Sequence, residues 1–151
     1  MPASLVSLVA DLSIQADGPA TRLASAWLAR QASEFEVPAS EVDRLELCLN
    51  EALANIINHS APVTLKSPIH LVLQVECHAG TGTATVTVSD AGPRFDSTLA
   101  SPHNRPASLA EAKPGGLGLL LIRSFSDHLG YRYSNGHNHL KFGVRWASAD
   151  E

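Results

Sequence analysis

The feature that most constrains this chain is residues 46–59, where polar and apolar side chains separate onto two sides of a helix. At 3.6 residues per turn, Glu51, Asn55 and His59 fall on one side, with Asn58 beside them. Another side is apolar and carries Leu45, Leu49, Ala52, Leu53 and Ile56. Asn and His each cost roughly half a kcal/mol of helix propensity relative to Ala, so their alignment with a Glu indicates a polar role. A solvated helix face is the simpler alternative.

Bulk composition limits both the size of the fold and its partners. A chain of 151 residues with 44% hydrophobic content predicts one domain over residues 1–151, large enough to bury a core without disulfides or structural metal. The net charge is −4, from 11 basic and 15 acidic residues, and the basic residues are not clustered in a run. This balance argues against nucleic acid or an anionic membrane surface as a partner.

The cysteines and the N-terminus predict a cytoplasmic protein. Cys48 and Cys77 lie far apart in the sequence, which is typical of free thiols in a reducing compartment. Residues 1–12 are apolar, but they have no basic segment or cleavage pattern, and Asp11 interrupts them. We therefore expect neither a signal peptide nor a membrane span.

Hydrophobic periodicity and turn residues predict the element order. In sequence order they indicate a strand at 4–14, a helix at 20–35, a helix from a Ser40–Asp43 capping box to about Ser60, strands at 69–77 and 83–89, a helix at 119–128, and strands at 131–133 and 139–146. An Asn-Gly pair at 135–136 predicts a closing hairpin. The expected fold is α+β: a two-layer sandwich with a mixed or antiparallel sheet and helices on one face.

Two glycine motifs flank a long loop. Asp90-Ala91-Gly92 follows a predicted strand, and Gly115-Gly116-Leu117-Gly118 leads into a helix after a proline-rich segment. Loops of this length are functional or disordered. Backbone N–H groups and the positive dipole end at a helix start can hold phosphate. Each motif alone is also ordinary turn chemistry, so only their order after the helix at 46–59 favours a site.

In that order the motifs resemble the ATP-binding domains shared by Hsp90-type chaperones, type II topoisomerases, MutL and sensor histidine kinases. The stretch 51–55, Glu-Ala-Leu-Ala-Asn, matches the N-box of that superfamily, 90–92 its first glycine box, and 116–119 its second. The amino-acid sequences of residues 90–96 and 115–122 are most similar to the corresponding motifs of the anti-sigma-factor serine-protein kinases. The likeness covers nearly the whole chain and implies a single histidine-kinase-like domain with a Bergerat-type ATP-binding fold.

The resemblance implies a role for each matching residue. Glu51 would be the general base, Asn55 would hold Mg²⁺ against the phosphates of ATP, and Asp90 would accept a hydrogen bond from the adenine amino group, with Gly92 leaving room for the base. The phosphates would lie against backbone N–H groups of Gly115, Gly116, Gly118 and Leu119. Residues 97–114 would form a mobile lid. Phosphoryl transfer fits these residue types, because it needs positioning, a metal ion and a hydroxyl-orienting carboxylate.

The implied activity is that of an ATP-dependent serine/threonine protein kinase of the anti-sigma type. Its substrate would be a small antagonist protein in a partner-switching pathway, a sigma factor is a second candidate ligand, and the family implies a homodimer. The alternatives are a non-catalytic ATP-binding interaction module and a histidine-kinase-like ATPase domain, the latter disfavoured because no phosphoacceptor helix pair precedes the N-box.

Three histidines have competing interpretations. His59 could touch the nucleotide, but a helix-capping role is favoured. His137 and His139 share one strand face, as metal ligands can, yet no third ligand is evident.

Overall fold

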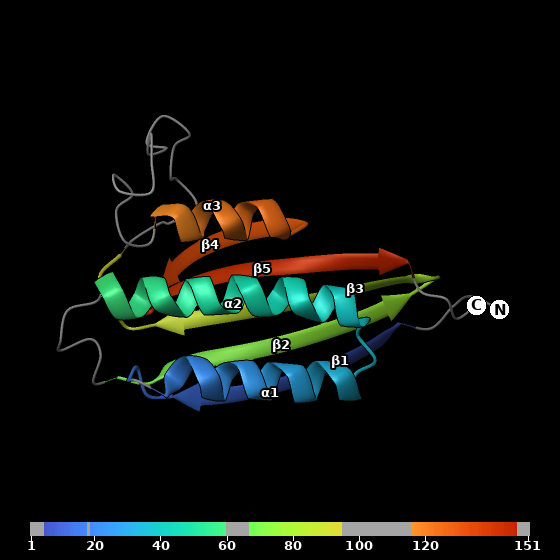
Figure 1. Cartoon of the computed structure of the whole chain (residues 1–151), viewed down its shortest axis with the longest axis horizontal. Helices are drawn as coiled ribbons and strands as arrows, with labels where there is room; N and C mark the ends of the chain where they lie inside the picture. Colours follow the sequence, from blue (N-terminus) through green and yellow to red (C-terminus); the bar gives the residue numbers. More distant parts are fainter. Residues whose placement is uncertain (1–4, 18, 60–66, 95–115, 148–151) are drawn as a thin grey trace.

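The computed structural model describes residues 5–17, 19–59, 67–94 and 116–147, which form a five-stranded sheet with three helices on one face (Figure 1). The elements in chain order are β1 (Val6–Ile14), α1 (Ala20–Glu34), α2 (Ala39–His59), β2 (Ile69–His78), β3 (Thr81–Asp90), α3 (Gly116–Phe125), β4 (His128–Ser134) and β5 (His137–Ala147). This is the predicted α+β sandwich. Within the described residues, no helix is both long enough and apolar enough to cross a membrane.

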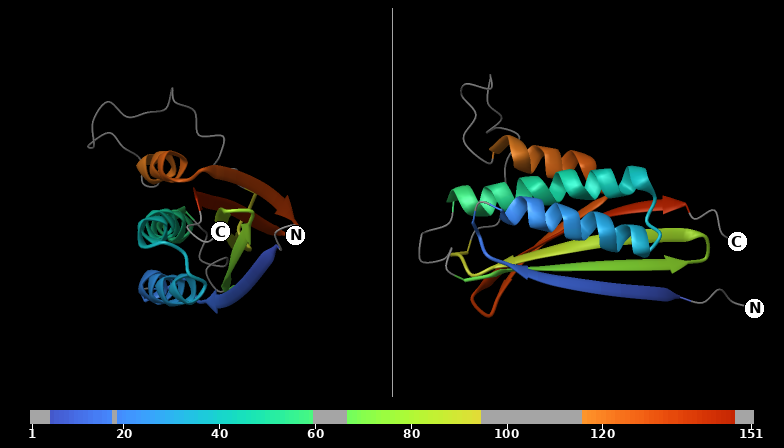
Figure 2. Two further views of the ribbon diagram at one scale, coloured as in Figure 1. Left: turned by 90° about the vertical axis from the view of Figure 1, so that its right-hand side faces the viewer. Right: turned by 60° about the horizontal axis from the view of Figure 1, so that its bottom comes forward.

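The strand order is β1-β2-β3-β5-β4, and each neighbouring pair is antiparallel. The sequence left open whether the sheet is mixed or antiparallel, and the structure shows that it is antiparallel. Alternation sets which face each side chain occupies. Leu71, Leu73 and Val75 are buried under the helices, whereas Val72 and Gln74 between them are partly exposed. Figure 2 shows the helices of the described residues on one side of the twisted sheet.

Two tight turns fix the hairpin registers. Asn135 and Gly136 join β4 to β5 with φ angles of 53° and 75°, as the Asn-Gly pair predicts for a two-residue hairpin turn. Ala79 and Gly80 join β2 to β3 with φ angles of 52° and 80°. A positive φ is uncommon for Ala, so this turn is held by the long strands on either side of it.

The core lies between the sheet and the helices. The apolar side of α2 is buried as predicted, with Leu45, Leu49 and Leu53 fully inside. Each such side chain contributes about 1.5–3 kcal/mol by leaving water. Trp27 of α1 and Phe142 of β5 are also buried and belong to this core.

The structure corrects the bounds of the third helix. α3 begins at Gly116 and ends at Phe125, whereas the sequence predicted residues 119–128. The chain leaves the helix early because the Asp127 N–H donates to the Gly143 carbonyl at 2.7 Å. His128 therefore starts β4.

The predicted capping box at Ser40 and Asp43 is wrong. α2 begins one residue earlier, at Ala39, and the Pro38 carbonyl accepts the N–H groups of Glu41 and Val42 at 3.0 Å each. Ser40 lies inside the first turn, and its hydroxyl donates to the neighbouring Glu41 carboxylate instead.

Candidate functional site

The predicted site residues come from elements that meet at one end of the molecule. The C-terminal half of α2, the end of β3 and the start of α3 all lie at this end (Figure 1). α2 and α3 pack against each other, and β3 pairs with β5, which begins there. The three sequence motifs, far apart in the chain, are therefore brought to the same end of the sandwich.

Buried polar side chains also concentrate at this end. Among the described residues, the buried polar or charged ones are Asn55, Asp90 and Asn138, with exposed fractions of 9%, 9% and 7%. Burying such groups costs free energy unless they are hydrogen-bonded. Two of the three were predicted site residues. Their burial distinguishes them from a solvated helix face and from an ordinary surface turn.

Asp90 presents one carboxylate oxygen to the protein and keeps the other available. The Gly92 N–H donates to Oδ1 at 2.8 Å, and Nδ2 of Asn138 donates to the same oxygen at 3.3 Å. Both hydrogen bonds that the described residues make to this carboxylate fall on Oδ1. Asp90 therefore closes the Asp-x-Gly turn and also retains Oδ2 as an acceptor, the arrangement required to receive a proton donor from a ligand.

Asn138 is a site residue that the sequence did not reveal. It lies opposite Asp90 in the pairing of β3 with β5, and its Nδ2 also donates to the carbonyls of Gly92 (3.3 Å) and Pro93 (2.9 Å). The Tyr131 hydroxyl donates to its Oδ1 at 2.5 Å. In the sequence, Asn138 ends a Ser-Asn-Gly-His-Asn run that is typical of a turn. Only the strand register could have placed it beside Asp90.

Glu51 and Asn55 continue the side of α2 that contacts α3. Earlier on this side, Arg44 and Cys48 reach backbone carbonyls of α3, and Glu51 and Asn55 follow at helical spacing. Burial raises the pKa of Cys48 to about 11, with opposing smaller effects of the Arg44 and Glu51 charges. Glu51 follows Cys48 by three residues on α2, so helical spacing puts the two on the same side of the helix.

The second glycine motif forms the start of α3. Gly116 is its first residue, and Gly118 and Leu119 lie in its first turn. Backbone N–H groups in a first helical turn lack partners within the helix, which suits them to an anion. Gly115 and the predicted lid at 97–114 lie outside the described residues.

His59 lies on α2, whereas His137 and His139 lie on β5. His59 is the last residue of α2, and its side chain lies outside the described parts of the chain. His139 is hydrogen-bonded to Ser89 at 2.7 Å and to Ser134 at 3.3 Å. The described residues contain no group of three His, Cys, Asp or Glu side chains able to hold a metal ion.

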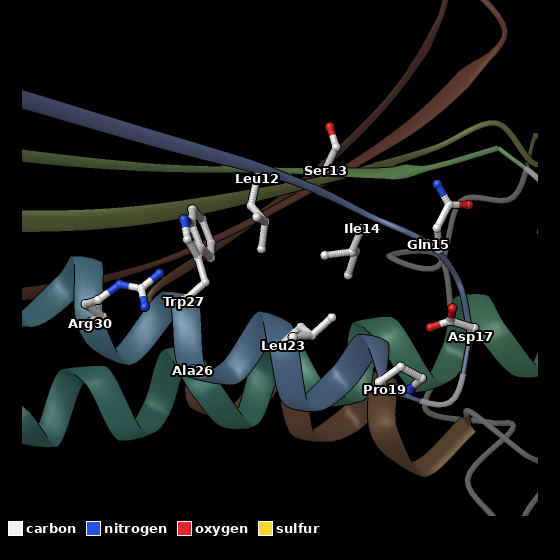
Figure 3. A pocket seen from close by; sticks show the side chains of 10 residues that line it. All are labelled: Leu12, Ser13, Ile14, Gln15, Asp17, Pro19, Leu23, Ala26, Trp27 and Arg30. Carbon is white, nitrogen blue, oxygen red and sulfur yellow. The ribbon is translucent and has the colours of Figure 1, made fainter.

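A separate cavity lies between β1 and α1 (Figure 3). It has a volume of about 370 Å³, and Leu12, Ile14, Leu23 and Trp27 form its apolar lining. Arg30 lies near one end and Asp17 near the other (Figure 3). The cavity lies beside α1, whereas Glu51, Asn55 and Asp90 come from α2 and β3, so it is not part of the candidate site.

The described residues form an α+β sandwich with a cluster of buried polar side chains at one end, and the comparisons name its family. Residues 14–144 match the family described as histidine kinase-like ATPase domain. The chain belongs to this family, which confirms the superfamily that the motifs of the sequence resemble.

Part of the chain is similar in sequence to a bacterial protein kinase. The chain is 36% identical over 96 residues to the serine/threonine-protein kinase BtrW of Bordetella bronchiseptica. The aligned region covers 64% of this chain and 65% of that protein, so the match spans slightly less than two thirds of the relative.

Solved structures share the fold at low sequence identity. The crystal structure of the RsbU and RsbW domains of a Mycobacterium tuberculosis protein matches 93% of this chain and 34% of that chain, with a TM-score of 0.65 and 14% identity. The SiaB–SiaC complex of Pseudomonas aeruginosa matches 91% of this chain and 89% of that chain, with a TM-score of 0.52 and 13% identity. At these identities the likeness supports the fold.

Proposed function

We propose that this protein is an ATP-dependent serine/threonine protein kinase of the anti-sigma type, which phosphorylates a small antagonist protein. The observation that carries the proposal is that Glu51 and Asn55 lie one helical turn apart on the side of α2 that faces α3. A nucleotide-holding site alone gains nothing from a carboxylate one turn before a metal ligand. The named relative, a serine/threonine-protein kinase, supports the same activity.

The residues present fit ATP and Mg²⁺. Oδ2 of the buried Asp90 is an acceptor for the adenine amino group, and the buried Gly92 adds no side chain beside the base. The start of α3, at Gly116 and Gly118, suits the phosphates. The Asn55 amide oxygen is a hard ligand of the kind that Mg²⁺ accepts beside phosphate and water. Mg²⁺ bound there would neutralise charge on the phosphates.

Glu51 supplies the proton chemistry of the proposed reaction. Its carboxylate accepts the proton of the substrate serine hydroxyl as that oxygen attacks the γ-phosphorus of ATP. The bond between this phosphorus and the bridging oxygen of ADP breaks, and ADP leaves with the electron pair. The products are phosphoserine, ADP and a protonated Glu51, which then returns its proton to water.

The test is transfer of labelled γ-phosphate from ATP to a serine of a candidate antagonist protein. Glu51→Gln keeps the side-chain shape but removes the base, so transfer should fall by roughly 10² to 10⁴-fold. Binding of Mg-ATP and antagonist, measured separately, should persist in the variant. If the wild type binds both ligands yet transfers no phosphate, the kinase proposal fails and a non-catalytic ATP-binding interaction module replaces it.

Sigma-factor binding and homodimer formation belong to the same proposal. Both come from the resemblance to anti-sigma-factor kinases, as does the use of an antagonist partner. The SiaB–SiaC structure, solved as a complex of a similar fold with a second protein, supports the choice of a protein partner. Sedimentation of the chain alone, and with a candidate sigma factor, tests both.

A further inference from the structure

Arg44 joins α2 to the end of α3. It lies on α2 two helical turns before Glu51, and its Nε donates to the backbone carbonyl of Phe125, the last residue of α3, at 3.0 Å. Nη2 of the same guanidinium lies 3.1 Å from Oδ1 of Asp127. A third contact, of 3.8 Å, joins Nη1 to Glu41 within α2. The planar guanidinium directs donors from three separate nitrogen atoms at these acceptors, whereas an ammonium group presents its three donors from one atom.

Asp127 is itself fixed to the sheet. Its backbone N–H donates to the Gly143 carbonyl at 2.7 Å, and its Oδ2 accepts the Arg145 N–H at 2.6 Å. Burial acts to raise the pKa of Asp127, but the hydrogen bonds from Arg44 and Arg145 outweigh it and hold the pKa below its usual value. Arg44 therefore faces a carboxylate at neutral pH and connects α2, α3 and β5 at one point.

A second contact defines the register of the two helices. The Cys48 Sγ–H group points to the Ile122 carbonyl at 3.9 Å. Arg44 and Cys48 are four residues apart on α2. Their partners on α3, Phe125 and Ile122, are three residues apart and occur in the reverse order. This is the relation expected of antiparallel helices, and Figure 1 shows α2 and α3 running in opposite directions. Continued from Cys48 and Ile122 at about 1.5 Å per residue, the register brings Glu51 level with about Leu119.

We propose that Arg44 is a positioning residue for the nucleotide site. By holding the end of α3 against α2 and Asp127, it sets the level of the glycine motif at the start of α3 relative to Glu51 and Asn55. The inference rests on the proposed function, in which that motif holds the phosphates of ATP. A slip of one residue would move the motif by about 1.5 Å, and a misplacement of about 1 Å can cost roughly 10²-fold in rate.

The adenine half of the site is independent of this contact. Asp90 and Asn138 belong to neighbouring strands, and their hydrogen bonds to each other, to Gly92 and to Pro93 do not involve Arg44. In the proposed reaction the γ-phosphate lies beside Glu51, where α2 and α3 meet. Loss of Arg44 should therefore weaken recognition of this terminal phosphate more than recognition of the base. The ratio of ATP affinity to ADP affinity separates this role from a general loss of stability, which would lower both.

The experiment measures Mg-ATP and Mg-ADP affinity by calorimetry in the full chain. In Arg44→Ala, the preference for ATP over ADP should fall by about ten-fold or more, with ADP affinity within about three-fold of the wild type. Arg44→Lys should recover part of the preference, because an ammonium can meet Asp127 but does not also direct a donor at the Phe125 carbonyl. Arg22→Ala, an exposed position on α1, is the matched control and should behave as the wild type.

Equal losses of ATP and ADP affinity in folded Arg44→Ala, or an unchanged preference for ATP, would overturn the inference. If Arg44→Ala does not fold, Asp127→Asn and Arg44→Lys provide the same comparison. This readout does not need phosphate transfer. A wild type that prefers ATP but transfers no phosphate would therefore refute the kinase proposal, while the ratio in the variants would still decide the role of Arg44.

Discussion

Nδ2 of Asn138 donates a 3.3 Å hydrogen bond to Oδ1 of Asp90, from the position directly opposite it in the β3–β5 pairing. Both side chains are buried, and the Tyr131 hydroxyl holds the far side of the Asn138 amide. The carboxylate is thus oriented by a neighbouring strand as well as by its own turn. Among the described residues, both hydrogen-bond donors to this carboxylate contact Oδ1.

Asn138→Ala should weaken ATP binding by about five- to ten-fold. The substitution removes a donor to Asp90, and one hydrogen bond of this kind is worth about 1 kcal/mol. Calorimetric titration with ATP gives the affinity. Tyr131→Phe removes only the hydroxyl that supports Asn138, so its effect should be smaller. Wild-type affinity in Asn138→Ala would show that the Asp90 turn alone orients the carboxylate.

Asp90→Asn should lower ATP affinity by about ten-fold or more while leaving the fold intact. The variant oxygen would continue to accept from Gly92 and Asn138, which leaves the amide NH₂ group where Oδ2 was. A donor would then face the adenine amino group, and the mismatch costs roughly 1 to 3 kcal/mol. Calorimetry measures the affinity, and a thermal melt checks the fold. Unchanged ATP binding would mean that Asp90 does not contact the base.

Asn55→Ala should weaken Mg-ATP binding more than metal-free ADP binding. The reason is that the lost amide oxygen is the proposed ligand of Mg²⁺, which takes few ligands from the protein at phosphate sites. Titrations with and without Mg²⁺ measure the difference. Asn58→Ala is the control, because Asn58 lies on the same helix but is exposed. Equal binding of both nucleotides to Asn55→Ala, with and without metal, contradicts the metal role.

Gly82→Ala should destabilise the protein by about 1–3 kcal/mol, the usual range for overpacking. Gly82 lies opposite Trp146 in the sheet, and a Cβ at this position would come within 2.1 Å of the indole ring. Gly130→Ala, on β4, is the control, because a Cβ there meets no atom within 4 Å. Urea unfolding of both variants measures the two free energies. Equal stabilities would show that the indole moves aside without cost.

His128 should contribute to loss of stability in mild acid. Burial, followed by the charges of Lys141 and Arg145, lowers the pKa of His128 in the folded protein. The unfolded chain, with a His pKa of about 6.5, then binds the proton more readily, so this contribution is present above that pH and is lost as pH falls below it. In His128→Gln, which keeps a hydrogen-bonding group near Thr85, the free energy of unfolding should fall less between pH 8 and pH 5. A decline equal to that of the wild type would exclude His128 as a source.

The sequence determined the element order and the apolar side of α2, because these depend on local spacing. The candidate site residues came from the resemblance of three motifs to a family of ATP-binding domains. The helical period placed Glu51 and Asn55 on one side of a helix. The Asn135-Gly136 pair fixed a hairpin turn, since few other pairs accept two positive φ angles. The glycine motifs marked the end of one strand and the start of a helix.

Only the tertiary structure decided the contacts made between distant segments. The choice of an antiparallel sheet, the pairing of Asn138 with Asp90, and the contact of Arg44 with Phe125 and Asp127 depend on register across strands and helices. The early end of α3 has the same origin, because the Asp127 N–H bond to Gly143 outweighs the helix propensity of the residues near it. Such contacts leave no periodic pattern in the sequence, because they join residues that are far apart in the chain. Asp127 and Gly143 are 16 positions apart, and the other pairs are 48 or more positions apart.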